Sequence, residues 1–305
     1  MRVILRKLSL FFPVALGIST LVFFLIHMIP GDPVEIMLGE GAQEANILEL
    51  RHDLGLDRPV WEQYLVFLKG LCKGDLGQSI KTREPVSRMI RTRFPATFQL
   101  TLFSMSIAVL LAIPLGVLSA VRQYSFLDYS SMFMALLGIS MPNFWLGPLL
   151  IIFFSVKLGW FPVSGMGSFS HLILPSITLG TALAALLARM TRSSMLEEIR
   201  AEYVQAARAR GLSEGMVIFK HTLKNAMIPV ITVLGLQFGS LLTGAIITET
   251  IFSWPGIGRL LITSINTRDY PVVQGCILFI ALAYLVVNFA TDIIYSFVDP
   301  RIRYG

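Results

Sequence analysis

The chain carries one charged, alanine-rich stretch between two long apolar runs, residues 202–229: EYVQAARARGLSEGMVIFKHTLKNAMIP. Its pattern predicts a short helix, a stop at Gly211 and a second helix from about Ser213. Glycine just beyond a helix adopts the left-handed conformation at no steric cost. Ala206 and Ala207 leave one face of the first helix nearly flat, which lets the surface of another protein approach closely. The stretch has no apolar stripe wide enough to lie in lipid, so we expect it to lie outside the bilayer.

The rest of the chain has the composition of a polytopic membrane protein. It has 305 residues, of which 54% are apolar and 14% charged, and its mean hydropathy is +0.70. A soluble protein of this size needs far more charge to cover its surface. Apolar runs that approach or exceed the ~20 residues of a membrane helix occupy residues 8–28, 97–121, 131–156, 172–187, 230–251 and 275–297. We therefore predict an all-α protein with six transmembrane helices, the fourth interrupted at its start by Pro175.

The placement of charge predicts the orientation. Six spans put both termini on one side of the membrane, and the lysines and arginines lie overwhelmingly on that side. By the positive-inside rule, both termini and residues 202–229 are cytoplasmic. The net charge of +6 is thus interpreted as a topology signal and not as a nucleic-acid surface. Arg2, Arg6 and Lys7 resemble the start of a signal peptide, but the apolar run is too long and no small-residue cleavage site follows, so we expect a retained first span.

One extramembrane loop of some size, residues 31–96, follows the first span. Asp57 is predicted to cap a helix with Pro59 in its first turn, and the helix to stop near Gly70 or Gly74. Its apolar stripe is expected to cover the top of the membrane bundle, and a partner surface is the alternative. The stripe consists of Trp61, Tyr64, Leu65 and Leu68. Cys72 and Cys276 both fall near the outer face, where two unpaired, packed thiols are favoured over a disulfide.

Several motifs resemble those of a transporter family. Gln205-Ala206-Ala207, Gly211 and Ile228-Pro229 resemble the "EAA loop" with which permease subunits of ABC importers dock into a separate ATPase, although the usual glutamate is Gln205 here. The following motifs are similar to those of the dipeptide/oligopeptide/nickel branch: Pro30-Gly31-Asp32-Pro33, Leu54-Gly55-Leu56-Asp57-Arg58-Pro59, Gln63-Tyr64, Gly74-Asp75-Leu76-Gly77-Gln78-Ser79, Ser140-Met141-Pro142, Leu174-Pro175-Ser176, Arg192-Ser193-Ser194-Met195, residues 249–256 (ETIFSWPG), Arg268-Asp269-Tyr270-Pro271 and Asp299-Pro300-Arg301-Ile302-Arg303.

The resemblance implies a type I ABC importer permease of the bacterial or archaeal inner membrane. It implies a first helix within 1–30, an outer loop with short helices at 31–96, a five-helix core at 97–298 with a coupling loop at 195–229, and a tail at 299–305. The implied partners are a second, homologous permease subunit in a heterodimer, two ABC ATPases, an extracytoplasmic solute-binding protein and membrane lipid. Contact with the ATPase is expected at Glu202, Tyr203, Gln205, Ala206, Ala207, Arg208, Arg210, Gly211, Lys220, Asn225 and Pro229.

The sequence offers no catalytic site. It has no Walker A motif, so ATP and Mg²⁺ are expected on the partner ATPases and this chain is expected to bind no cofactor and to be no enzyme. No metal site is predicted, because the four histidines are far apart. They are His27, His52, His171 and His221. Residues 138–142, GISMP, supply only half of a nucleophile elbow and lack a nearby base.

The translocation pathway is predicted from polar residues in or near the spans, since unpaired polar groups in lipid face helices or a water-filled cavity. The candidates are Ser140, Asn143, Thr178, Gln237, Ser240, Thr243, Glu249 and Asn288. For any single one, hydrogen bonding between helices is the alternative. Asp292 and Glu249 lie towards the ends of spans, which argues against proton coupling and a secondary transporter. Gly235 and Gly239 form a GxxxG motif for close helix packing, and Pro142 and Pro148 are expected to kink the third span. The cargo is predicted to be a di- or oligopeptide, with a nickel chelate or glutathione as alternatives.

Overall fold

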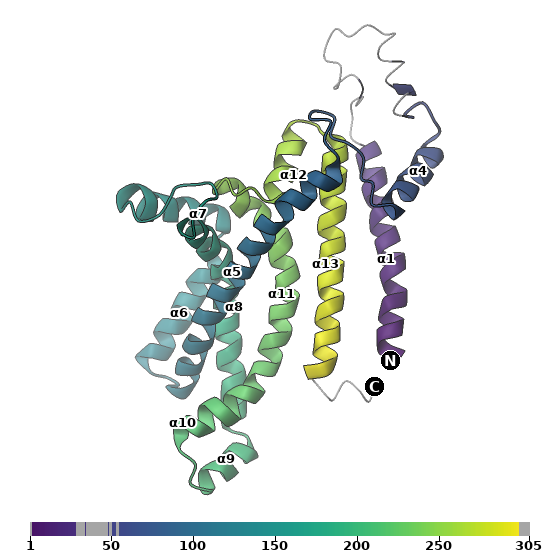
Figure 1. Ribbon diagram of the computed structural model, residues 1–305. Coiled ribbons are helices and arrows are strands. Elements are labelled where there is room, and N and C mark those ends of the chain that lie inside the picture. The colour runs from purple at the N-terminus through teal and green to yellow at the C-terminus, as the bar shows by residue number, and fades with distance from the viewer. Residues whose placement is uncertain (1, 29–33, 35–47, 49–50, 53–54, 299–305) are drawn as a thin grey trace. The chain divides into compact units, whose positions relative to one another are not determined.

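The computed structural model describes residues 2–28, 34, 48, 51–52 and 55–298, and they are predominantly helical (Figure 1). The motif at residues 30–33 and the tail at 299–305 lie outside the described residues, as does the side chain of Asp292. The chain divides into two units, described separately below. The first comprises Met1–Thr97 and Pro255–Leu285, and the second Phe98–Trp254 and Val286–Gly305.

The first unit contains α1 (Arg2–His27), α4 (Val60–Cys72), the start of α5 (Val86–Val121), α12 (Ile257–Asn266) and most of α13 (Tyr270–Val298). α4 packs on α1 through aromatic rings. Phe23 of α1 is buried, and its ring centroid lies 5.3 Å from that of Tyr64 and 5.5 Å from that of Phe67. The hydroxyl oxygens of Thr20 and Tyr64 are 2.6 Å apart.

The outer loop differs from the prediction in two respects. Asp57 does not cap α4: its carboxylate accepts a hydrogen bond from Nδ1 of His52 at 2.7 Å, and this bond lowers the Asp57 pKa. Pro59 takes the cap position, and the helix runs to Cys72 as expected. The apolar stripe is only partly covered, because Tyr64 packs on α1 whereas Trp61 is 62% exposed.

A buried carboxylate ties the loop after α4 to the α12–α13 turn within the first unit. Asp269 accepts hydrogen bonds from Ser79 Oγ at 2.5 Å and from the Ile80 amide at 3.1 Å. Nearby, a Cβ on Gly275 of α13 would lie 2.5 Å from Cγ1 of Val86, so the start of α5 packs directly on α13. Within the first unit, these contacts hold the segment after α4 and the start of α5 against the α12–α13 turn and α13.

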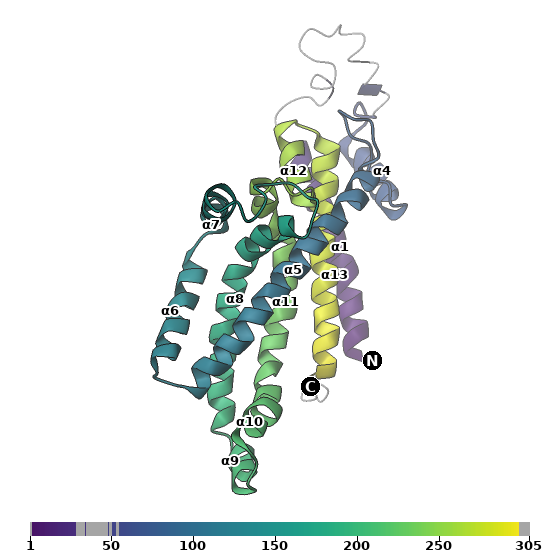
Figure 2. The ribbon, with the colours of Figure 1, turned by 60° about the vertical axis from the view of Figure 1, so that its left-hand side comes forward.

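The second unit contains the remaining elements, in which α6, α8 and α11 run side by side (Figure 2). They are the rest of α5, α6 (Phe126–Ser140), α7 (Asn143–Leu150) with the π-helix η1 (Ile151–Lys157), α8 (Ser170–Ile199), α9 (Glu202–Ala209), α10 (Glu214–Met216) with the π-helix η2 (Val217–Thr222), α11 (Leu223–Ile251) and the end of α13. Small residues allow close packing against α8. A Cβ on Gly138 of α6 would lie 3.1 Å from the Ala185 Cβ.

The third predicted span is bent at Pro142, as expected, whereas the predicted interruption of the fourth span is wrong. Residues 131–156 do not form one straight span, because α6 ends at Ser140 and the next helix starts at Asn143 with a bend of 106°. Met141 is extended, with φ −87° and ψ 113°, as the residue before a proline prefers. Pro148 lies inside α7. Pro175 does not interrupt the fourth span: α8 begins earlier, at Ser170, and continues to Ile199. Pro175 is the sixth residue of α8, where it removes one backbone hydrogen bond without ending the helix.

Among the described residues, four helices are long and apolar enough to cross a membrane, and the bent α6–α7–η1 pair would make a fifth. They are α5, α8, the helix from Glu214 to Thr243 and α13 up to Thr291. In α1 the apolar helix Phe11–Leu25 is shorter than these. The helical membrane fold is thus confirmed, whereas the count of six spans and the cytoplasmic side of the termini stay predictions.

Candidate coupling segment

The predicted helix, glycine stop and second helix are present in the coupling segment, residues 202–229. α9 ends at Ala209, and Gly211 follows with φ +78°. The Gly211 amide donates to the Arg208 carbonyl at 2.9 Å, and the Leu212 amide donates to the Ala207 carbonyl at 3.4 Å. This pair of bonds is the Schellman motif, which requires a left-handed residue. Ser213 then precedes α10, as predicted.

A small apolar core holds α9 against η2. Val204, Ala207 and Val217 are buried together, and Leu212 packs against them. The prediction of a flat face formed by Ala206 and Ala207 is therefore wrong for Ala207, which points into this core. The two alanines are successive and so lie about 100° apart around the helix. Ala206 is exposed.

Tyr203 anchors α9 to the two long helices that flank the segment. Its hydroxyl donates to Oε2 of Glu198, in the last turn of α8, at 2.5 Å. The Asn225 side chain, in the first turn of α11, lies near the same phenol and acts to lower its pKa. Partial burial, followed by the bond to Glu198, raises the pKa of Tyr203, so the phenol keeps its proton at neutral pH. One side chain thus connects α8, α9 and α11.

Arg208 and Glu214 bridge the turn from the outside. The guanidinium donates to both carboxylate oxygens, at 2.8 Å and 3.3 Å. Such an exposed pair contributes little to stability. It does orient the Arg208 side chain beside the glycine turn. Arg208 was expected to contact the ATPase, and within this chain it already pairs with Glu214.

The remaining candidates of the segment fall into two groups. Glu202, Gln205, Arg210, Gly211 and Lys220 are exposed, as are Ala206 and Arg208. Asn225 and Pro229 are half-buried in α11. Gln205, which replaces the usual glutamate, donates from Nε2 to the Arg200 carbonyl at 3.4 Å. The exposed group therefore forms the face available to another protein.

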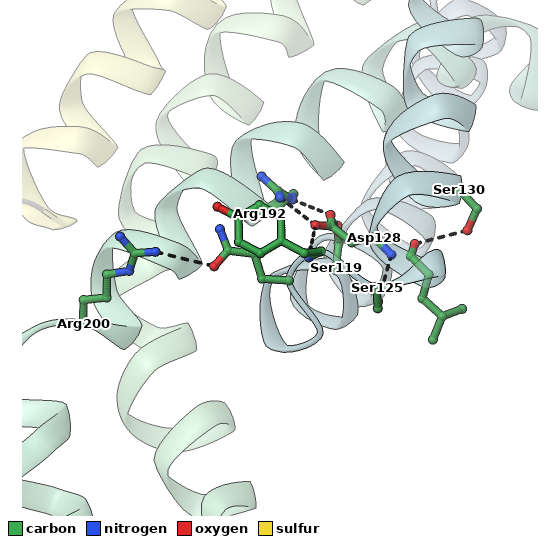
Figure 3. Close-up of polar contacts among 9 residues, drawn as sticks. Ser119, Ser125, Asp128, Ser130, Arg192 and Arg200 are labelled. Carbon is green, nitrogen blue, oxygen red and sulfur yellow. Dashed lines mark hydrogen bonds and ion pairs between the residues drawn. The ribbon is translucent and has the colours of Figure 1, made fainter.

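A buried ion pair that sequence reasoning missed lies at the same end of the second unit (Figure 3). Asp128 of α6 is 2% exposed and accepts hydrogen bonds from Nε and Nη2 of Arg192 in α8, at 2.6 Å and 2.7 Å. Its carboxylate also accepts from the Ser119 hydroxyl and, at 2.9 Å, from the Tyr124 amide. Sequence reasoning did not single out Asp128. Two sequence features point to this pair. Asp128 lies three residues after Ser125, where a helix begins, and the neighbouring span carries basic residues.

The pathway candidates are spread over α6, α7, α8, α11 and α13. Thr178 is fully buried and donates to the Leu174 carbonyl of its own helix at 2.8 Å, and Thr243 donates to the Ser240 carbonyl at 2.9 Å. Glu249 is fully buried near the end of α11. The remaining candidates are exposed or half-buried: Ser140 and Asn143 flank the α6–α7 bend, and Gln237, Ser240 and Asn288 lie on α11 and α13. The buried Oδ1 of Asn288 has no hydrogen-bond partner among the described residues.

Other expectations concern thiols, metals and glycines. Cys72 and Cys276 are both free, but only Cys276 is packed, since Cys72 is exposed. In the described part of the chain, no group of three or more His, Cys, Asp or Glu side chains could hold a metal ion. Gly235 faces the Thr291 side chain of α13 within this chain, which accounts for one half of the GxxxG motif without a second subunit.

Comparison with known proteins places the chain in a family. Residues 112–304 match the family "Binding-protein-dependent transport system inner membrane component", and residues 1–101 match its N-terminal companion family. The chain is 45% identical to the dipeptide transport system permease protein DppB of Alkalihalophilus pseudofirmus, covering 98% of both chains. It is 48% identical to the di/tripeptide transport system permease protein DppB of Pseudomonas aeruginosa, covering 99% of this chain and 98% of the relative. It is 44% identical to the glutathione transport system permease protein GsiC of Pectobacterium atrosepticum, with 98% of each covered.

Solved structures share the fold at low sequence identity. A chain of the MetNI methionine ABC transporter in an inward-facing conformation superposes with a TM-score of 0.58 at 21% identity, covering 69% of this chain and 96% of that one. A chain of an amino acid ABC transporter crystallised with histidines gives a TM-score of 0.53 at 18% identity, covering 70% and 94%. From these matches over its full length, the chain belongs to the family of inner membrane components of binding-protein-dependent transport systems, as a multi-pass permease subunit and not an enzyme.

Proposed function

We propose that this chain is the permease subunit of an ATP-driven importer of di- and oligopeptides, in which it forms one half of the translocation pathway. The observation that carries the proposal is the 45–48% identity, over 98–99% of the chain, to permeases named for dipeptides or di- and tripeptides. The other half of the pathway would come from a homologous permease subunit. Two ABC ATPases would hold ATP and Mg²⁺, and an extracytoplasmic binding protein would deliver the peptide.

The coupling segment is the proposed contact with an ATPase. Its exposed face supplies an acid, an amide and several cations around a turn fixed by Gly211. Because the apolar core holds α9 on η2, which continues into α11, and Tyr203 bonds to the end of α8, a displacement of α9 would move both long helices. Alternating access follows from that movement: ATP binding would open the pathway outwards to the binding protein, and hydrolysis would return it to the inward-open state.

Polar residues at the bend and on the long helices are the proposed lining of the pathway. Ser140 and Gln237 are accessible in the single chain, at the end of α6 and along α11. Thr178, whose hydroxyl is bonded to its own helix, is a weaker candidate. Backbone and amide groups at such positions suit a peptide, which carries a donor and an acceptor on nearly every residue.

Glutathione is the second candidate cargo. The alignments with the glutathione permeases run over 300–302 residues, close to the length of this chain, whereas those with the dipeptide permeases run over 328–333 residues. This chain therefore lacks a stretch that the dipeptide relatives carry, and residues 158–170 form a short connection between η1 and α8.

Uptake by the complete importer tests the proposal. Proteoliposomes with this chain, its permease partner, its ATPases and its binding protein would receive labelled di- and tripeptides, glutathione and a nickel chelate in parallel. ATP-dependent peptide uptake is expected, and it should vanish with a hydrolysis-deficient ATPase. Exclusive uptake of glutathione or of the chelate would replace the cargo. Uptake that persists with the hydrolysis-deficient ATPase would refute ATP coupling.

A further inference from the structure

We propose that Asp128 and Arg192 form a fixed joint that makes α6 move with α8, so that displacement of the coupling segment is carried into the bent α6–α7 helix pair. The inference rests on the proposed function, because it concerns how an ATPase-driven movement reaches the membrane helices. Both residues act as positioning residues: neither belongs to the coupling face or to the candidate pathway.

The Asp128 carboxylate is fully hydrogen-bonded. Its two oxygens accept four hydrogen bonds: two from the Arg192 guanidinium, one from Ser119 near the end of α5, and one from the Tyr124 amide in the connecting turn. Bidentate pairing fixes the mutual orientation of two helices as well as their distance. A carboxylate that is 2% exposed and fully bonded is a rigid connection, unlike an exposed ion pair.

The Asp128 carboxylate also holds the strained turn between α5 and α6. Tyr124 is in the left-handed region, with φ 63°, although it is not a glycine, and its ring is 71% exposed. A bulky residue in this region requires surrounding contacts that hold it. The bond from its amide to Asp128 is such a contact. Asp128 therefore determines where the α5–α6 turn lies relative to α8.

The end of α8 connects directly to the coupling segment. Arg192 lies seven residues, or about 10 Å along the helix axis, before the end of α8. Only two residues separate the end of α8 from the start of α9, and Tyr203 bonds back to Glu198 in the last turn of α8. A force on α9 is thus applied to the same helix end that holds Asp128.

Movement of α6 also displaces the elements that it contacts or leads into. Gly138, near the far end of α6, lies against Ala185 and Thr181 of α8, so the two helices are in contact at both ends of α6. Beyond the bend, a Cβ on Gly147 of α7 would lie 3.3 Å from side chains of Ile251 and Phe252 at the end of α11. Movement of α6 with α8 therefore reaches the bend and the far end of α11.

Transport stoichiometry tests the joint. Asp128→Asn keeps the shape of the side chain and removes its charge, and Arg192→Gln removes the other partner. Breaking a buried pair is costly, and we expect peptide import per ATP hydrolysed to fall about tenfold or more in assembled complexes with near-normal ATPase rates. Arg192→Lys, which keeps the charge without the bidentate geometry, should give an intermediate value. Arg122→Gln is the matched control, because Arg122 is exposed in the same α5–α6 connection. An unchanged import-to-ATP ratio in Asp128→Asn would overturn the joint.

A distance measurement keeps the proposal testable if the variants fail to fold. Tyr129 and Ser193 are exposed and directly follow the two paired residues. Spin labels at Tyr129→Cys and Ser193→Cys, in a chain with Cys72→Ser, should report the same narrow distance with and without ATP. If this distance changes with nucleotide while Asp128 and Arg192 are intact, the fixed joint is refuted. This readout needs no cargo, so it is independent of failure to import peptide, which would instead refute the proposed function.

Discussion

Gly180 of α8 passes so close to Ser104 of α5 that a Cβ on the glycine would lie 2.6 Å from the Ser104 carbonyl oxygen. The obstacle is backbone, which cannot rotate away as a side chain can. The two helices therefore touch at a point that tolerates only glycine.

This contact predicts that Gly180→Ala destabilises the second unit. The added methyl must push α5 and α8 apart, and overpacking of this kind costs about 1–3 kcal/mol. Thermal unfolding of the purified chain in detergent should show a lower Tm. Gly17→Ala is the control, because a Cβ there meets nothing within 4 Å. Equal Tm values for the two variants would contradict the close approach.

The left-handed turn predicts a selective effect at Gly211. Val has a branched Cβ that the conformation at φ +78° disfavours, so Gly211→Val should cost about 1–2 kcal/mol and distort the Schellman turn. We expect weaker co-purification of the ATPases and reduced ATP-dependent import. Gly211→Asn should retain most of both, since asparagine tolerates this region. If Gly211→Asn is as damaging as Gly211→Val, the added side chain and not the backbone conformation causes the loss.

The phenol of Tyr203 predicts a loss of coupling without a loss of folding. Tyr203→Phe removes the bond to Glu198, worth about 0.5–1.5 kcal/mol, and leaves the ring in place. Import per ATP should fall several-fold while the complex still assembles. Tyr129→Phe, at an exposed tyrosine of α6, serves as the control. A normal ratio in Tyr203→Phe would show that the anchor is dispensable.

The small core of the coupling segment predicts where its local stability resides. Val204→Ala removes two methyl groups from a fully buried site and should cost about 1–2 kcal/mol. Glu214→Gln breaks only an exposed ion pair and should change little. Hydrogen exchange of the α9 amides should accelerate in the first variant alone. Faster exchange in both would place the stability in the ion pair.

Sequence reasoning recovered the parts of the fold that depend on local chemistry. The glycine stop between α9 and α10 follows from the conformation that only Gly211 adopts easily, and the break after Met141 follows from Pro142. Both signals act within a few residues, so they can be read without knowing what packs against them.

Features that depend on distant residues were not recovered. Asp128 was not singled out because its partner, Arg192, lies 64 positions along the chain. Ala207 was expected on an open face because nothing local reveals that Val217 folds back onto it. The N-cap role assigned to Asp57 failed for a local reason, since His52, five residues earlier, hydrogen-bonds its carboxylate.

The contrast between the two cysteines gives the protein its own reporter of sidedness. Cys276 is fully buried and Cys72 is exposed, so a thiol reagent should modify the native chain at one position. With a membrane-impermeant maleimide, spheroplasts should be labelled at Cys72 before lysis, since residues 31–96 are predicted to face outwards. Labelling that appears only after lysis would invert the orientation assigned to every loop, and no engineered cysteine is needed to decide it.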